Sequence, residues 1–432
     1  MTLQKVREYI IAMQADYTPQ NANDVHEPSS YWQETVTHLR LSDDLPSVID
    51  VAIIGGGVMG AAISYWLARA GVRSVLLERT RLAHEATGRN GGFVSIGPAE
   101  SYPAAIRRSG HETAHAILNL TRENQALVRR ILQEEDIACD YHEPGGLSLA
   151  FDATHLTELA EEAMALQADG VAATLLDRAQ VQELIHTPLG RDIVGGRFMP
   201  EEGVVHPIRF VQGLVQAARG SSVQACTTTV LRLVPHSERV IVHTMHGPLQ
   251  AEAVIVAVNA WTGELLPQLA HLITPVRGQV LAYAPTVPVF TTGMSAPITP
   301  TGEYWQQRND GTIVLGGCRA VAPGSDIGVR LNQPTAEVQV ALEQVFPRLF
   351  PELHGLQVAH RWAGMMAFTR DYLPMVDRVP DMPGVLVVGG FCGHGMPFAL
   401  RLGQLMAEVL TGKGRPSELL PFRLKRETLL EH

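Results

Sequence analysis

Cysteine is scarce in this chain of 432 residues, and the few that occur form no CxxC pair. The four cysteines lie far apart, at positions 139, 226, 318 and 392, so the sequence encodes neither a zinc ribbon nor a disulfide framework. Such a chain suits a reducing compartment, and we expect it to be cytoplasmic. A secretory signal is not expected either, because charged residues surround only a short apolar patch in residues 1–17.

Clusters of basic residues are also missing. Lys and Arg together number 34 against 44 Asp and Glu, which gives a formal net charge of -10. This balance leaves no nucleic-acid footprint, and it repels anionic membrane surfaces. We therefore expect small-molecule partners and no nucleic acid.

Long apolar runs are absent, apart from one uncharged stretch at residues 51–68 that nearly reaches the length of a membrane span. The glycines within it favour a different interpretation, so no transmembrane segment is expected. A composition of 46% hydrophobic and 18% charged residues, with 39 Gly and 27 Pro, is typical of a loop-rich α/β protein. The length allows two domains.

The apolar residues 51–54 predict a buried parallel strand, which runs directly into GGGVMG at residues 55–60. In this GxGxxG pattern, Gly55 permits the tight turn, Gly57 lets the backbone approach a pyrophosphate, and Gly60 lets the next helix pack closely. A second strand at 74–77 ends at Glu78, which is placed to bind a ribose. Because strand, glycines, helix, strand and acid lie in one βαβ unit, the segment predicts a dinucleotide site.

The fingerprint alone does not choose between FAD and NAD, but two other segments do. Residues 84–92 (HEATGRNGG) are small and polar, so their backbone can approach a large planar ligand. Near the end of the chain, a buried strand at 385–388 precedes GGFCGHGM (389–396) and a helix from about residue 398 to 410. This second strand-glycine-helix junction favours FAD.

Five segments resemble the FAD-dependent amine and amino-acid oxidoreductase (DAO) superfamily, in the style of its γ-glutamylputrescine oxidase, glycine oxidase and sarcosine oxidase branches. They are the fingerprint, ATGRNGG (86–92), GVVHP (203–207), VIVAVNAW (254–261) and GFCGHG (390–395). The resemblance implies FAD as cofactor and oxidation of the C–N bond of a small amine or amino acid. Hydride would pass to the flavin, the imine would hydrolyse to a carbonyl product, and no catalytic acid or base is assigned. The electron acceptor is oxygen or another molecule.

The resemblance also implies which residues contact the cofactor. We expect the 86–92 segment at the flavin and pyrophosphate, Asn259 beside the cofactor, and His394 at the ring. The expected cofactor contacts are Gly55, Gly57, Val58, Met59, Gly60, Glu78, Arg79, Thr87, Gly88, Arg89, Asn90, Gly91, Gly92, Asn259, Ala260, Trp261, Gly364, Gly393, His394, Gly395 and Met396.

The expected fold is α/β, with a Rossmann-type FAD-binding domain and a substrate domain built on a mostly antiparallel sheet. Strand character at 276–283 and 302–317, with a hairpin turn at Asn309-Asp310-Gly311, indicates the second sheet. We assign residues 48–108, 150–265 and 355–432 to FAD binding, 109–149 and 266–354 to the substrate, and 1–47 to an N-terminal extension. The candidate pocket residues are Tyr304, Arg319, Arg277, Met366, His394 and Met396.

Several positions depart from the family pattern. Pro397 and Met365 or Met366 stand where relatives place a substrate-holding lysine or arginine, which favours a longer or less acidic amine than a free small amino acid. Val314 replaces a lysine linked to oxygen activation, so oxidase and dehydrogenase both remain open. The sarcosine-oxidase attachment cysteine has no counterpart near Gly364, so we expect FAD to be non-covalent.

Other interpretations compete with this one. HETAH at residues 111–115 matches the HExxH zinc-hydrolase pattern, although chance and a packing helix explain it more simply, and we assign no metal. A reductase that also uses NAD(P)H would need a second GxGxxG, which is absent. A non-catalytic FAD-binding subunit stays open, and it would fail to bleach with any amine.

Overall fold

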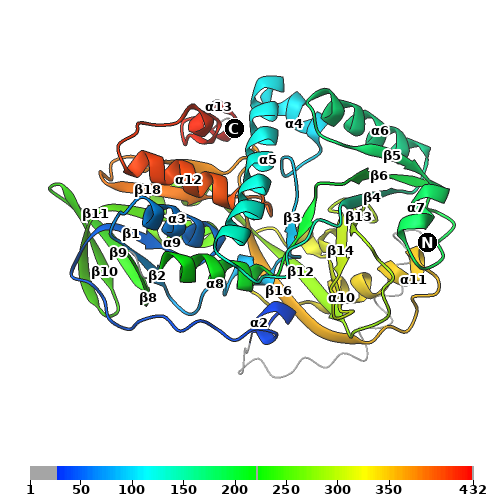
Figure 1. Cartoon of the computed structure of the whole chain (residues 1–432), viewed down its shortest axis with the longest axis horizontal. Helices are drawn as coiled ribbons and strands as arrows, with labels where there is room; N and C mark the ends of the chain where they lie inside the picture. The colour runs from blue at the N-terminus through cyan, green and yellow to red at the C-terminus, as the bar shows by residue number, and fades with distance from the viewer. Residues whose placement is uncertain (1–26, 220–221, 431–432) are drawn as a thin grey trace.

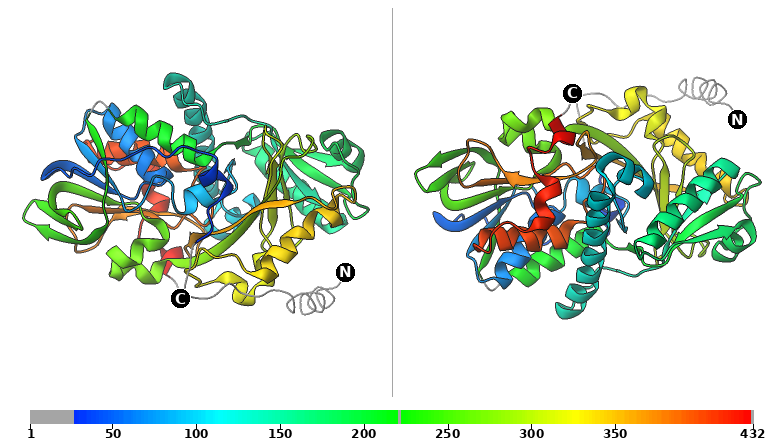
Figure 2. Two further views of the ribbon diagram at one scale, coloured as in Figure 1. Left: turned by 90° about the horizontal axis from the view of Figure 1, so that it is seen from below. Right: turned by 90° about the horizontal axis from the view of Figure 1, so that it is seen from above.

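The computed structural model describes residues 27–219 and 222–430. The expectation about a secretory signal, and residues 1–26 of the expected extension, lie outside these described residues. The chain forms two large sheets that lie side by side along the long axis, with helices on their outer faces (Figures 1 and 2).

The first sheet has eight strands and a parallel centre. β1 pairs in parallel with β2 and β11, β2 pairs in parallel with β8, and β11 pairs in parallel with β18. Three strands add antiparallel pairs: β17 pairs with β18, β10 with β11, and β9 with β10. The bounds are β1 (Val48–Ile54), β2 (Ser74–Glu78), β8 (Val223–Thr227), β9 (Val230–His236), β10 (Arg239–Thr244), β11 (Gly247–Val256), β17 (Met375–Arg378) and β18 (Val385–Gly389).

Three helices cover one face of this sheet, and α3 contacts both of the others and is buried along nearly its whole length: α3 (Val58–Arg69), α8 (Pro207–Ala218) and α12 (Ala399–Leu410). The two apolar cores lie on opposite faces, because alternate residues of β1 point to opposite sides. Ile53 packs in the core on the helix side, whereas Ala52 and Ile54 pack in the core on the other side.

The second sheet is antiparallel except for one parallel pair, β13 with β4. Its order is β16-β12-β15-β14-β13-β4-β6-β5. The predicted hairpin is present, because β14 and β15 pair antiparallel across the turn at Gly311. The bounds are β4 (Gly146–Ala150), β5 (Thr174–Asp177), β6 (Gly195–Met199), β12 (Thr274–Tyr283), β13 (Gly293–Ala296), β14 (Glu303–Gln307), β15 (Ile313–Gly316) and β16 (Val358–Phe368). The predicted fold class is thus confirmed.

The expected domain boundaries stay a proposal, but three strands depart from them. β5 and β6 lie in the segment 150–265, and β16 lies in 355–432, both assigned above to FAD binding, yet all three pair within the second sheet. Their partners are mostly distant in sequence, so no local pattern assigns them to a sheet.

The remaining elements connect or cover the sheets. α5 stands between the two halves in Figure 1, and the short strands β3 and β7 pair with each other. No helix among the described residues combines the length and apolar character that crossing a membrane requires. The bounds are α2 (Tyr31–Glu34), β3 (Phe93–Val94), α4 (Tyr102–Ser109), α5 (His111–Glu134), α6 (Ala153–Ala168), α7 (Arg178–Leu184), β7 (Gly203–Val204), α9 (Thr262–Leu265), α10 (Ala336–Glu343), α11 (Val345–Leu349) and α13 (Glu427–Leu430).

Candidate active site

One large cavity of 1080 Å³ extends from the glycine-rich turn after β1 to the inner face of the second sheet. Its volume lies slightly above the usual range for small-molecule and cofactor sites, about 300–1,000 Å³. The fingerprint, the segment after β2, the end of β11 and the turn after β18 all line it.

The turn between β1 and α3 is built for close backbone packing. Gly55 has a φ of 110°, and a Cβ there would lie 2.6 Å from the Ala257 carbonyl oxygen. A Cβ on Gly60 would lie 1.9 Å from the carbonyl oxygen of Gly55. The two glycines therefore let the start of α3 approach the end of β1, and the first turn of that helix lines the cavity.

Glu78 stands at the end of β2 and lines the same part of the cavity. Its carboxylate accepts hydrogen bonds from the backbone N–H of Gly56 (2.7 Å) and of Thr80 (2.9 Å). Beside it, the Arg79 guanidinium lies 4.3 Å from the centre of the Trp261 ring and pairs with Glu85 at 2.6 Å. These residues suit an adenosine group, because a fixed carboxylate accepts from ribose hydroxyls.

The loop after β2 is held from behind by the N-terminal segment 28–33. The indole N–H of Trp32 donates to the Asn90 carbonyl (2.7 Å), and the Gln33 amide donates to the His84 carbonyl (2.8 Å). Ser30 donates to the Gly88 carbonyl, and the buried Arg89 donates to the Pro28 carbonyl at 3.1 Å. Residues 28–33 of the expected N-terminal extension therefore support this loop.

Replacing Trp32 with Phe should make the loop release its ligand faster. The change removes one indole N–H and leaves the Asn90 carbonyl without that donor, which costs about 1–3 kcal/mol. If the loop contacts FAD, we expect about tenfold faster FAD release, measured as recovery of flavin fluorescence on dilution.

Trp66→Phe is the matched control, because Trp66 also donates its indole N–H to a carbonyl, that of Leu400 at 2.8 Å, away from the loop. Equal release rates for the two variants would show that the segment 28–33 does not hold the cofactor loop.

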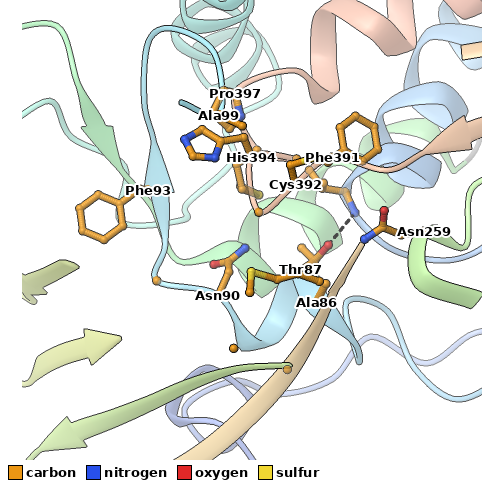
Figure 3. A pocket seen from close by; sticks show the side chains of 18 of the residues that line it. Ala86, Thr87, Asn90, Phe93, Ala99, Asn259, Phe391, Cys392, His394 and Pro397 are labelled. Atoms are coloured by element: carbon orange, nitrogen blue, oxygen red, sulfur yellow. Dashed lines mark hydrogen bonds between the residues drawn. The ribbon is translucent and has the colours of Figure 1, made fainter. Parts of the chain in front are cut away.

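The end of β11 contacts both strand-glycine junctions: Ala257 packs against Gly55 after β1, and the turn after β18 contacts Asn259. This residue follows β11 with a φ of 48°, and its side-chain oxygen accepts from the backbone N–H of Gly390 at 3.0 Å, just after β18. The turn that follows brings His394 to the cavity, where Figure 3 shows it with Thr87 and Asn90.

The His394 imidazole has an unused nitrogen in this turn. Burial lowers its pKa, so the ring stays neutral near pH 7. Its Nδ1 has no hydrogen-bond partner among the described residues. A neutral imidazole with an open nitrogen suits a polar ligand group.

On the second sheet, Tyr304 and Arg319 line the cavity as expected. Burial raises the pKa of Tyr304 to about 12, and its hydroxyl has no hydrogen-bond partner in the described part of the chain, so it is a free donor. The Arg319 guanidinium lies 5.5 Å from the centre of the Phe368 ring, and its single hydrogen bond goes to the Ser325 carbonyl at 3.3 Å.

Arg319 differs from the other arginines that line the cavity. Arg79, Arg89 and Arg197 each have a carboxylate within ion-pair distance. No such carboxylate of residues 27–219 or 222–430 lies near Arg319, and burial lowers the pKa of its guanidinium. The charge of Asp326 acts on Arg319 from farther away, but Asp326 is already paired with Arg277, so Arg319 is a candidate contact for an anionic ligand group.

The structure brings most of the expected residues to the cavity and leaves a few outside. The residues at the lining are Gly55, Gly57, Val58, Met59, Glu78, Arg79, Thr87, Arg89, Asn90, Gly91, Asn259, Trp261, Tyr304, Arg319, Gly364, Met366, Gly393, His394, Gly395 and Met396. Gly60, Gly88, Gly92 and Ala260 lie behind it, where the glycines allow close packing: a Cβ on Gly88 would lie 2.0 Å from the Ala83 carbonyl oxygen.

Arg277 does not belong with the pocket residues. Its guanidinium pairs with both carboxylate oxygens of Asp326, at 2.7 and 2.9 Å, and donates to the Gln333 carbonyl. Arg277 is not among the lining residues, whereas the next three residues of β12, Gly278, Gln279 and Val280, are. The sequence alone does not show whether the Arg277 side chain faces the cavity or Asp326.

Several polar residues at the cavity were not predicted, among them a group on the second sheet and beside it: Ser148 on β4, Arg197 on β6, Ser295 on β13, Glu162 on α6 and Glu202. They come from separate elements, and no motif connects them. The only available signal was the alternation in GLSLA at 146–150, which points Ser148 to the polar face of its strand.

The HExxH pattern lies in the first turn of α5, so the packing helix expected for this segment is present. His111 is exposed and pairs with Asp169 at 3.0 Å, while His115 Nε2 accepts from the side-chain NH2 of Asn119 at 3.1 Å. Among residues 27–219 and 222–430, no three His, Cys, Asp or Glu side chains gather as a metal-binding group. The zinc alternative thus lacks a ligand set there.

Comparison with known proteins agrees with this geometry. A family model described as FAD dependent oxidoreductase (DAO) matches residues 50–409. The gamma-glutamylputrescine oxidoreductase of Escherichia coli (strain K12) is 25% identical over 402 residues, covering 89% of each chain, and the glycine oxidase of Bacillus licheniformis is 25% identical, covering 88% of this chain and 97% of the relative. The crystal structure of glycine oxidase from Geobacillus kaustophilus aligns with a TM-score of 0.76 at 22% identity, covering 88% of this chain and 99% of the other.

Proposed function

Because this chain belongs to the family of FAD-dependent oxidoreductases, we propose that it holds FAD non-covalently and oxidises the C–N bond of a small amine or amino acid. The observation that carries the proposal is the continuity of one cavity. It begins at Glu78, where an adenosine would bind, and reaches Tyr304 and Arg319 on the second sheet. A cofactor that spans the first part presents its reactive end to the second.

The residues present fit the cofactor at several places. The backbone at the start of α3 can face a pyrophosphate, because Gly55 and Gly60 leave no Cβ in the way. Glu78 would accept from the ribose, and the open Nδ1 of His394 would meet the polar edge of the ring. FAD, when bound, would supply the acceptor for the hydride that leaves the carbon beside nitrogen.

Covalent attachment has little support in the described part of the cavity. Cys392 lines it, but burial raises the pKa of this thiol to about 11, and Thr369 lies within hydrogen-bond distance of its sulfur. The thiol therefore stays protonated and is a poor nucleophile near pH 7.

The substrate end of the cavity favours an amine that carries an acidic group. Arg319 is a cation without a counter-ion, and Tyr304 offers a free hydroxyl donor beside the same space. The relatives named above are an oxidoreductase of gamma-glutamylputrescine and an oxidase of glycine, so their names agree with an amine or amino-acid substrate. The protein supplies position and a water-poor setting for the amine.

An anaerobic amine screen tests the function. The purified protein should be yellow and contain FAD, and at least one amine or amino acid should bleach the flavin under anaerobic conditions. Admission of oxygen to the reduced protein then separates an oxidase, which regains its colour at once, from a dehydrogenase that needs another acceptor.

A flavin-containing protein that no amine or amino acid bleaches would contradict the proposal. That result would favour a non-catalytic FAD-binding subunit.

A further inference from the structure

Most charged side chains that line the cavity are already neutralised. Each has an opposite charge close by: Arg79 pairs with Glu85, Arg89 with Glu27, Glu100 with Arg108, Glu162 with Arg197 and Glu264 with Arg330. Glu78 is held by backbone N–H groups at the cofactor end. Glu303 likewise accepts from backbone N–H groups, those of Ile298, Thr299 and Cys318. Apart from these two acids, the arginine and glutamate side chains of the described lining that lack an ion pair are Arg319 and Glu202.

Glu202 directly precedes β7, and its buried side chain packs against the start of β4. Its carboxylate presses against Gly146, where an added Cβ would lie 1.8 Å from Oε2. Burial raises its pKa, while the charge of Arg197 and the Ile96 backbone lower it. Because Arg197 is also paired with Glu162, this end of the cavity holds two carboxyl groups and one guanidinium.

A row of polar side chains leads from this acid toward Tyr304. Four neighbouring strands contribute one residue each in register: Arg197 faces Ser148, Ser148 faces Ser295, and Ser295 faces Tyr304. Arg197 donates to the Ser148 hydroxyl at 3.3 Å, and the two serine hydroxyls lie 2.9 Å apart. The row thus provides hydrogen-bonding groups along the cavity wall, and an apolar substrate tail would form no hydrogen bonds with them.

The two unpaired charges are well separated. Arg319 follows β15, whereas Glu202 packs on β4, three strands away in the sheet. Three strand spacings amount to about 14 Å. The amino and carboxyl groups of a free α-amino acid are separated by one carbon, so such a substrate cannot contact both residues.

We propose that Glu202, together with Ser148 and Ser295, binds a second, cationic nitrogen on the tail of the substrate amine. The substrate is then an elongated amine with a basic tail group. This inference rests on the proposed function, because it concerns the substrate of the same cavity. A bound ammonium would pair with the Glu202 carboxyl group, and the serine hydroxyls would accept hydrogen bonds from its remaining N–H groups.

Two amines with the same five-carbon chain test the proposal: 1,5-diaminopentane and pentylamine. Calorimetry should give a lower Kd for the diamine in the wild-type holoenzyme. Glu202→Gln keeps the shape and removes the charge, so we expect it to weaken diamine binding about 10- to 100-fold and to leave pentylamine nearly unchanged.

Glu343→Gln is the matched control, since Glu343 pairs with Arg361 at the surface, outside the cavity lining. The rate of anaerobic flavin bleaching by each amine gives an independent readout of the same preference.

Three results would overturn the subsite. The wild-type protein could bind both amines equally, Glu202→Gln could weaken both equally, or it could slow bleaching by both with a shifted pH profile, which would make Glu202 a proton acceptor instead. In each case flavin bleaching by some amine would still support the proposed function. Failure of every amine to bleach the flavin, by contrast, would contradict that function, whatever the calorimetry showed.

Discussion

Replacing Gly60 with alanine should give a protein that loses its FAD during purification. The new Cβ would lie 1.9 Å from the Gly55 carbonyl oxygen, so the start of α3 must move away from the end of β1. Overpacking of this kind costs about 1–3 kcal/mol. Because that strain falls on the turn that would face the pyrophosphate, we expect FAD affinity to drop by about 100-fold, measured by titration of the apoprotein.

Gly71→Ala is the control within the same βαβ unit. Gly71 has a φ of 71°, so alanine strains the backbone there, but a Cβ meets no atom within 4 Å. We expect this variant to lose a little stability and to keep its FAD. If Gly60→Ala instead bound FAD as tightly as Gly71→Ala, the fingerprint turn could not be the pyrophosphate site.

Replacing Arg319 with methionine should remove the preference for amines that carry an acidic group. Methionine keeps the apolar contact with Phe368 but leaves no cation at this end of the cavity. The loss of one charge-assisted contact to a buried carboxylate costs about 2–5 kcal/mol. We expect kcat/KM for acidic amines to fall by about 100-fold, with a much smaller change for neutral amines, measured by anaerobic bleaching.

Arg348→Met controls for a general effect of removing an arginine from an aromatic ring. Arg348 also lies over a phenylalanine, with its guanidinium 5.7 Å from the centre of the Phe151 ring, but outside the cavity lining. Arg319→Lys should recover part of the activity, because it restores the positive charge. An equal loss on acidic and neutral amines would show that Arg319 only stabilises the wall.

The parts of the fold that the sequence predicted are those whose cause is local. Gly55, Gly60 and Glu78 lie within one βαβ unit, so their spacing alone specifies a turn, a close helix and an acid at the strand end. The hairpin at Gly311 is local in the same way. Family membership could be predicted because the five segments that resemble the family occur in the family's order.

The parts that the sequence did not predict depend on contacts between distant residues. Arg277 looks like a pocket arginine until its ion pair with Asp326 is visible, 49 residues along the chain. The sequence does not show that Glu202 and Arg197 line the cavity, because their positions depend on how the strands of the second sheet pair. The same reason places β5 and β6 in that sheet, against the boundaries expected from the sequence.

The support behind the cofactor loop has a consequence for how the protein matures on the ribosome. The buried Arg89 donates to carbonyls on both sides of itself, that of Pro28, 61 residues earlier, and that of Ala363, 274 residues later. A nascent chain that has completed its first βαβ unit thus still lacks one of the two anchors. Capture of the coenzyme should therefore follow synthesis of β16, and a chain stalled before that strand should emerge without it.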